Sequence, residues 1–179
     1  IWLKMTMTLF ETRIALMRSH EEIIGQRWSI DDSLWEADRN ILEHLSLELL
    51  RQHHIDIGND PVAMQELLGQ VTQLRRNKHP NETWEFTIEG KTIHVGLETL
   101  IAWCQPITDR ILSTCAQLLD EHDIGIKTLE LLDWNLEETS WPGLAPALSQ
   151  RLQLHSILPN TGIWSRIADI SDNLEQKKS

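Results

Sequence analysis

The sequence has no tyrosine, only two phenylalanines and two cysteines, and no apolar run of about 20 residues. A membrane-spanning helix needs about 20 consecutive apolar residues, so we expect no membrane span. The two cysteines are Cys104 and Cys115. If both lie on one helix they are roughly 16 Å apart, which is too far for a disulfide. Two free thiols suit a reducing compartment, and we therefore expect a cytoplasmic location.

Several motifs that carry chemistry are also absent. The sequence contains no glycine-rich phosphate loop, no Gly-x-Ser-x-Gly turn, no His-Glu-x-x-His pair and no paired Cys-x-x-Cys. The adjacent His53 and His54 would diverge by about 100° on a helix and are poorly placed to share a metal. We therefore predict that the chain is not an enzyme and needs no cofactor or metal.

Positive charge is scarce. Lysine and arginine number 16 against 27 aspartate and glutamate residues, which gives a formal net charge of −11. This balance disfavours a protein that coats nucleic acid with its whole surface. A local cationic face is still compatible with it, because salt screens distant charges beyond about 10 Å.

What the sequence has is helical periodicity, and it is clearest in residues 33–54. Leu34, Ile41, Leu45 and Leu49 recur at the spacing of one helical face. Ser33 and Glu36 fit a capping box, and basic residues in the last turn suit the helix dipole. Similar patterns predict helices over residues 8–26, from Asp60-Pro61 into the basic residues before Pro80, over 97–122 and over 145–158, and residues 126–134 are also rich in helix-forming residues. Within 97–122, Pro106 either kinks the helix or begins a new one after Gln105.

One segment differs. Residues 84–95, WEFTIEGKTIHV, alternate apolar and polar side chains around Glu89-Gly90-Lys91 and predict a small β-hairpin. The expected fold is therefore all-α: one domain over residues 1–179, a bundle of five to six helices with a hairpin insertion at 84–95 and a frayed tail at 171–179.

Residues 39–44 offer one catalytic hypothesis. Arg39-Asn40, three residues and His44 fit the Arg-polar-x-x-x-His motif of HEPN-type ribonucleases. In that family the arginine holds the scissile phosphate and the histidine assists attack by the ribose hydroxyl. The alternative is the solvated face of a long helix. A ribonuclease toxin that uses Arg39 and His44 is therefore the rival to a non-catalytic function.

The tryptophans and the acidic residues of 120–138 suggest a third class of function. Eight tryptophans are present, and Trp2, Trp141 and Trp164 lie in irregular contexts. Tryptophan is enriched at interface hot spots, although packing in the core explains most tryptophans equally well. Exposed tryptophans beside the acidic segment would make the chain a protein-only adaptor.

A basic cluster at 75–79, Arg-Arg-Asn-Lys-His, stands out in this acidic chain. Together with Arg51, His53 and His54 it could form one positive edge if the helices pack antiparallel. Such an edge could hold a phosphate backbone without reading sequence. Compensation of helix dipoles needs the same residues in the same places.

As a small helical bundle with an arginine-bearing edge, the chain resembles the small subunit of a type I CRISPR Cascade complex. It begins at Ile1 rather than methionine, with Met5 and Met7 close behind, as an internally translated C-terminal part of the large subunit could. The resemblance implies a non-catalytic, multi-copy subunit that contacts guide RNA, target DNA, other subunits and copies of itself. The candidate nucleic-acid-binding residues are Arg13, Arg18, Arg51, Arg75, Arg76 and Lys78.

Overall fold

The computed structural model describes residues 1–19, 22–76, 83–125, 131–136, 141, 143–152 and 157–159. These residues form seven strands and four helices. The strands are β1 (Trp2–Met7), β2 (Thr12–Met17), β3 (Ile23–Ser29), β4 (Thr83–Ile88), β5 (Lys91–Gly96), β6 (Leu131–Leu136) and β7 (Ile157–Pro159). The helices are α1 (Leu34–His53), α2 (Pro61–Arg76), α3 (Leu97–Glu121) and α4 (Leu144–Arg151).

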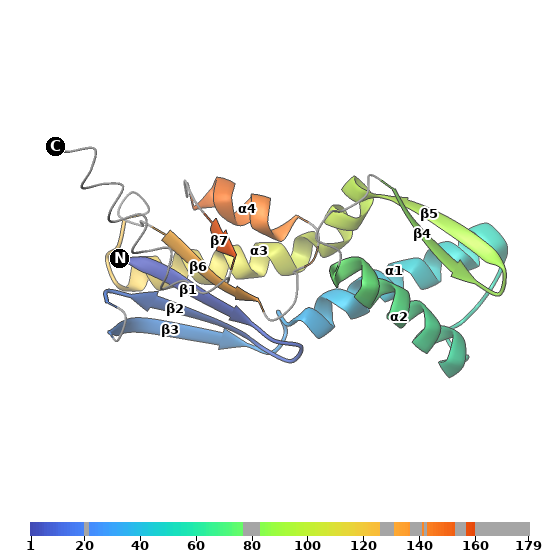
Figure 1. Cartoon of the computed structure of the whole chain (residues 1–179), viewed down its shortest axis with the longest axis horizontal. Helices are drawn as coiled ribbons and strands as arrows, with labels where there is room; N and C mark the ends of the chain where they lie inside the picture. Colours follow the sequence, from blue (N-terminus) through green and yellow to red (C-terminus); the bar gives the residue numbers. More distant parts are fainter. Residues whose placement is uncertain are drawn as a thin grey trace.

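Five of the strands form one mixed sheet in the order β3-β2-β1-β6-β7 (Figure 1). The first three strands are antiparallel neighbours, whereas β6 runs parallel to β1 and β7 runs parallel to β6. The pairing therefore changes from antiparallel to parallel at β1, the central strand, and in this sheet β2 runs opposite to the other four strands.

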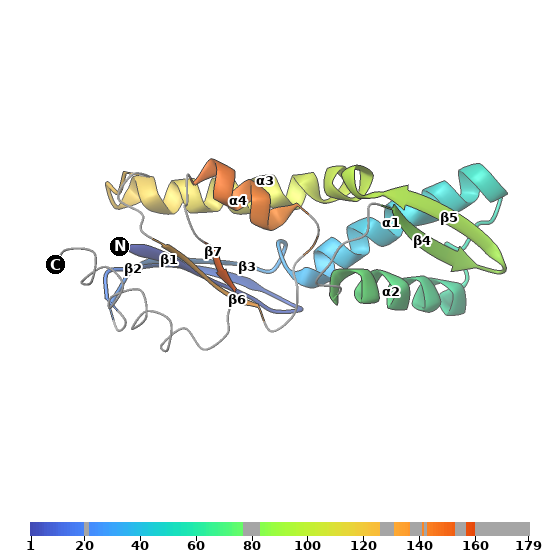
Figure 2. The same ribbon diagram turned by 45° about the horizontal axis from the view of Figure 1, so that its top comes forward.

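Helices α3 and α4 lie on one face of this sheet (Figure 2). Leu3, Met5 and Met7 of β1 are fully buried and alternate with Lys4 and Thr6. Residues directly opposite in an antiparallel pair share a face, so the register places Leu16 beside Leu3 and Ile14 beside Met5. This alternation gives β1 and β2 a shared apolar face.

The remaining elements form the other end of an elongated molecule (Figure 1). There α1 packs against α2 and α3, and the β4–β5 hairpin packs against α2, α1 and α3. The long helix α3 runs through both ends and continues past Pro106. The buried residues of both ends belong to a single hydrophobic cluster.

The prediction of an all-α bundle is wrong. Residues 8–26, predicted as one helix, contain a turn, β2 and part of β3, and the helix-forming segment 126–134 overlaps strand β6. In β2, Ile14 to Met17 are all buried, so the strand shows a short apolar run rather than clear alternation. Such a run cannot be distinguished from a buried helix by periodicity. The last predicted helix, 145–158, ends as α4 at Arg151, and β7 follows.

The remaining elements are confirmed. Ser33 is the N-cap residue of α1, and its Oγ accepts a hydrogen bond from the amide of Glu36 at 3.3 Å. Asp60 Oδ1 accepts the amides of Val62 and Ala63 at the start of α2. The hairpin occupies residues 83–96, close to the prediction. The predicted frayed tail, 171–179, lies outside the described residues. Among the helices that the structure describes, none combines the length and apolarity needed to cross a bilayer.

Candidate functional site

The carboxyl ends of the parallel strands are the first place to look for a site. In open sheets with parallel strands, ligands bind beyond these ends, at the point where the strand order reverses. In this chain that point is the end of β1, followed by the turn Thr8–Glu11 and close to the start of α1.

The β1–β2 turn is closed by its own side chain. Thr8 Oγ1 accepts the amides of Phe10 at 3.3 Å and Glu11 at 3.0 Å, while the Thr8 amide donates to the Glu11 carbonyl at 2.8 Å. A phosphate-binding loop needs several free amides pointing at the anion. This turn has no glycine, and the amides of Thr8, Phe10 and Glu11 are bonded within it.

The backbone amides at the N-terminus of α1, its positive end, are also hydrogen-bonded within the chain. The amides of Leu34 and Trp35 donate to the carbonyls of Thr8 at 3.3 Å and Leu9 at 3.0 Å. The next amide, that of Glu36, is bonded to Ser33 Oγ. A helix N-terminus attracts anions through such unbonded amides. Here the preceding turn and the N-cap residue occupy them.

Helix α3 is hydrogen-bonded to the connection between β3 and α1. Arg110 Nε donates to Asp32 Oδ1 at 2.6 Å, and Arg110 Nη2 donates to the Asp31 carbonyl at 2.8 Å. Thr12 Oγ1 donates to the Asp32 carbonyl at 2.7 Å. The β3–α1 connection is therefore tied to both β2 and α3. Within the described part of the chain, no group of three or more His, Cys, Asp or Glu residues could hold a metal ion.

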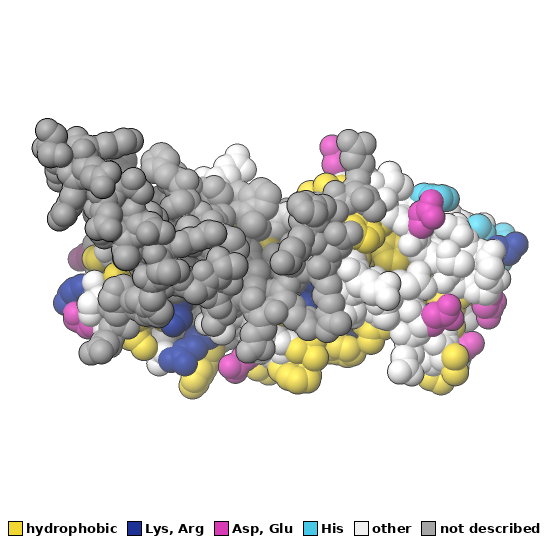
Figure 3. Space-filling model, viewed as in Figure 1, with side chains coloured by type: hydrophobic (Ala, Val, Ile, Leu, Met, Phe, Trp, Pro, Cys, Tyr) yellow, Lys and Arg dark blue, Asp and Glu magenta, His cyan; other side chains and the backbone are white. Residues whose placement is uncertain are grey.

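The solvent-exposed surface at this end of the sheet carries large hydrophobic side chains. Five large hydrophobic side chains from the β1–β2 turn, the end of β3, the β3–α1 connection and the first turn of α1 are exposed. We call them the apolar ridge: Leu9 (39% exposed), Phe10 (70%), Trp28 (73%), Ile30 (71%) and Trp35 (39%). Hydrophobic side chains are visible along the lower edge of the molecule in this region (Figure 3).

The contacts of the backbone show why these residues come together. The bond from the Trp35 amide to the Leu9 carbonyl joins the start of α1 to the turn. In the β2–β3 ladder, Thr12 is opposite Ser29 and Arg13 is opposite Trp28, which places the end of β3 beside the turn. Residues that are far apart in the sequence thus share one surface.

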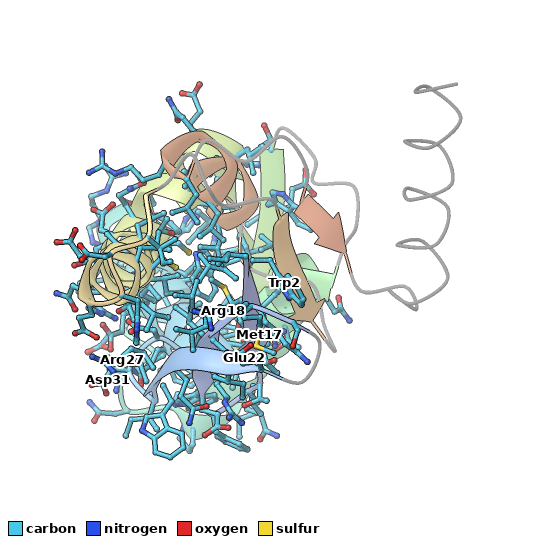
Figure 4. The ribbon with its side chains drawn as sticks, turned by 90° about the vertical axis from the view of Figure 1, so that its left-hand side faces the viewer. Trp2, Met17, Arg18, Glu22, Arg27 and Asp31 are labelled. Atoms are coloured by element: carbon cyan, nitrogen blue, oxygen red, sulfur yellow. The ribbon has the colours of Figure 1, made fainter. Side chains whose placement is uncertain are left out.

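Four of the six cations predicted to bind nucleic acid are placed by the structure, and these four are not brought together. Arg18 pairs with Glu22 at 2.8 Å, at the end of the sheet nearest the viewer in Figure 4. Arg51 pairs with Glu48 at 2.6 Å at the end of α1. Arg13 lies on β2 and donates to the side-chain carbonyl of Gln26, with 3.1 Å from Nε.

Arg75 is buried rather than at the surface. Its Nε and Nη2 donate to the two carboxylate oxygens of Asp38 at 2.9 and 3.0 Å, and the two side chains are only 1% and 2% exposed. The side chains of Arg76 and Lys78 lie outside the described residues. The four cations that the structure places therefore do not form the continuous positive ridge that the nucleic-acid hypothesis requires.

The residues of the ribonuclease motif have structural partners. Asn40 Nδ2 donates to the carbonyl of Trp103, and the His44 ring stacks on the Trp103 indole with centroids 5.0 Å apart. Arg39 pairs with Glu36 at 2.8 Å. Arg39 and Asn40 line an open hollow of about 150 Å³ between α1 and α3, which Arg110 also lines. The contacts of Asn40 and His44 serve the packing of α1 on α3.

The two cysteines are buried, and burial raises the pKa of each thiol from 9.0 to about 12; for Cys104 the charge of Asp38 adds to the effect. Because the thiolate is the reactive form, we expect the native protein to react negligibly with a disulfide reagent at pH 8, whereas the unfolded protein exposes two thiols. The free energy of unfolding should fall as the pH rises from about 9 toward 12, because only the unfolded state then loses these protons. Two fast-reacting thiols in native protein would contradict this expectation.

Sequence reasoning missed the residues that matter most on this surface. Trp28 lies between the predicted helices 8–26 and 33–54, where no element was predicted, and Trp35 lies within the second of these helices. Of the three tryptophans proposed as interface anchors, Trp141 is buried, Trp2 is half-buried on β1, and Trp164 lies outside the described residues. The only signal for Trp28 was its position among polar neighbours, Gln26, Arg27 and Ser29.

Comparisons with known proteins add no family. The chain matches no protein-family model, and no curated protein matches it.

Proposed function

We propose that the chain is a non-enzymatic protein-binding module and that the apolar ridge is its binding surface. The observation that carries the proposal is the gathering of five exposed large hydrophobic residues at one edge. At their exposed fractions, and with about 150–250 Å² for a large aromatic side chain, they present roughly 500 Å² of apolar surface. The largest apolar patch of a monomeric protein is about 300–600 Å² and is often functional.

The composition of the ridge also favours a protein partner. It contains two tryptophans and a phenylalanine, residue types that are enriched at the centres of protein interfaces. A phosphate backbone requires cations instead. The four candidate arginines that the structure places are each bonded to an acidic or amide side chain, and Arg75 is inaccessible. Binding of a nucleic-acid backbone, and with it the Cascade-type function, stays a prediction that these four arginines do not support.

Photo-crosslinking tests the proposal. A photoreactive amino acid replaces Trp28 in one variant and Val62, which is 74% exposed at the start of α2, in a matched control. We expect irradiation of cells that express the full chain to yield a covalent protein adduct at position 28 and none at position 62.

Three outcomes would contradict the proposal. Equal adducts at both positions would mean that position 28 reports exposure alone. Binding of single-stranded DNA that falls steeply with salt and is lost on Arg76→Glu with Lys78→Glu would support the backbone hypothesis instead. Cleavage of RNA that is lost on Arg39→Ala or His44→Ala would support the ribonuclease.

A further inference from the structure

Three charged residues near the apolar ridge, of both signs, form no ion pair within the part of the chain that the structure describes. The carboxylates of Glu11 and Asp31 are exposed and have no ion-pair partner among the described residues. Arg13, the cross-strand neighbour of Trp28, donates to the amide oxygen of Gln26 and to no carboxylate among those residues. The ridge thus has both a cation and two anions that can still gain a partner of opposite charge.

A second copy of the same surface supplies those partners. In a two-fold symmetric interface each residue faces the complementary position of the other subunit, so one patch must complement itself. Rotation of the ridge onto itself can bring Arg13 of one copy to a carboxylate of the other, in both directions at once. A uniformly basic or uniformly acidic partner would satisfy only one sign.

The area is sufficient for such a contact. Two ridges of roughly 500 Å² each bury about 1,000 Å², the size at which specific interfaces begin. Access is open as well, because Trp28 lies on β3, the outermost strand on this side of the sheet. Interfaces of this size are weak and reversible rather than obligate.

We infer that the apolar ridge joins two copies of this chain in a reversible two-fold dimer, with Phe10 and Trp28 as its apolar anchors and Arg13 facing a carboxylate, Glu11 or Asp31, of the other copy. The inference rests on the proposed function, since it names the partner of the same surface.

Analytical ultracentrifugation of the purified full chain tests it. We expect a concentration-dependent monomer–dimer equilibrium with a dissociation constant in the micromolar range. The double variant Phe10→Ser with Trp28→Ser should weaken the dimer at least about 30-fold, as loss of a hot spot of 2 kcal/mol or more does. Val62→Ser, an equally exposed residue on α2, should leave the dissociation constant unchanged. Unchanged circular dichroism and thermal unfolding would show that each variant is folded.

Charge variants identify the partner as a second copy. Arg13→Glu alone makes the ridge acidic, and Glu11→Arg with Asp31→Arg makes it basic, so each variant should dimerise more weakly than the original chain. An equimolar mixture of the two should form a heterodimer at least tenfold tighter than either homodimer. A non-specific apolar association would show no such recovery.

The outcomes separate this inference from the proposed function. A chain that is monomeric at all concentrations, or a dimer that the ridge variants leave intact, overturns the inference. If the chain is monomeric but position 28 still crosslinks to another protein, the protein-binding function stands with a different partner. If position 28 also yields no protein adduct, both are wrong.

Discussion

Replacement of Arg75 by alanine is expected to lower the free energy of unfolding by about 3–5 kcal/mol, the cost of removing one partner of a buried ion pair. The two bonds between Arg75 and Asp38 join α2 to α1, and neither side chain reaches solvent. Without the guanidinium the buried Asp38 carboxylate would lose two charge-assisted hydrogen bonds. Urea-induced unfolding followed by circular dichroism measures the difference.

A paired replacement is the control for this prediction. When Asp38 and Arg75 are changed together to asparagine and methionine, no buried charge is left without a partner, and much of the lost stability should return. Glu48→Gln is a second control, because the ion pair between Glu48 and Arg51 is exposed on its Arg51 side, so solvent screens it and its loss should change the free energy of unfolding little. A small loss for Arg75→Ala would show that the pair is not buried as described and would restore Arg75 as a surface cation.

Trp141→Ala is expected to cost about 3–5 kcal/mol, the range for removing a large aromatic side chain from a core. Trp141 is 2% exposed, and its Nε1 donates to Thr108 Oγ1 on α3 at 3.0 Å. The bond links the segment before α4 to the long helix. Trp141→Phe keeps most of the volume but leaves the hydroxyl acceptor without this donor, and should cost about 1–3 kcal/mol. Thermal or urea unfolding measures both variants.

Trp28→Ala is the matched comparison for Trp141→Ala. It removes the same side chain from a position that is 73% exposed, where little apolar surface is lost from the core. We expect its effect on the free energy of unfolding to stay within about 0.5–1 kcal/mol, as for ordinary surface substitutions. If the two tryptophans gave equal losses, the division between the core and the apolar ridge would be wrong.

Local signals predicted the helical half of the molecule well. The stripe of Leu34, Ile41, Leu45 and Leu49, the Ser33 cap and the Asp60 cap each lie within one segment, so their meaning does not depend on the rest of the chain. The hairpin is equally local, since its two strands are joined by Glu89 and Gly90, both with positive φ. In such segments the periodicity and the terminal residues are enough.

The mixed sheet could not be predicted in the same way. Strands β1 and β6 pair although more than 120 residues separate them, and Ile14 to Met17 of β2 are buried on both faces of the sheet. A strand in this position shows a short apolar run that also fits a buried helix. The candidate site fared worse, because nothing in the sequence indicates that the partner of Arg75 is Asp38, or that Phe10, Trp28 and Trp35 come together.

The sequence by itself determined the positions of α1, α2, α3 and the β4–β5 hairpin, together with the free state of both thiols, because each depends on neighbours within a few turns or on a simple distance along one helix. The tertiary structure alone decided the sheet, the burial of Arg75 and Trp141, and the exposure of the apolar ridge. These features depend on which distant segments pair. A side chain's access to water is a property of its neighbours in space, and the same arginine or tryptophan becomes a core residue or a binding residue according to them.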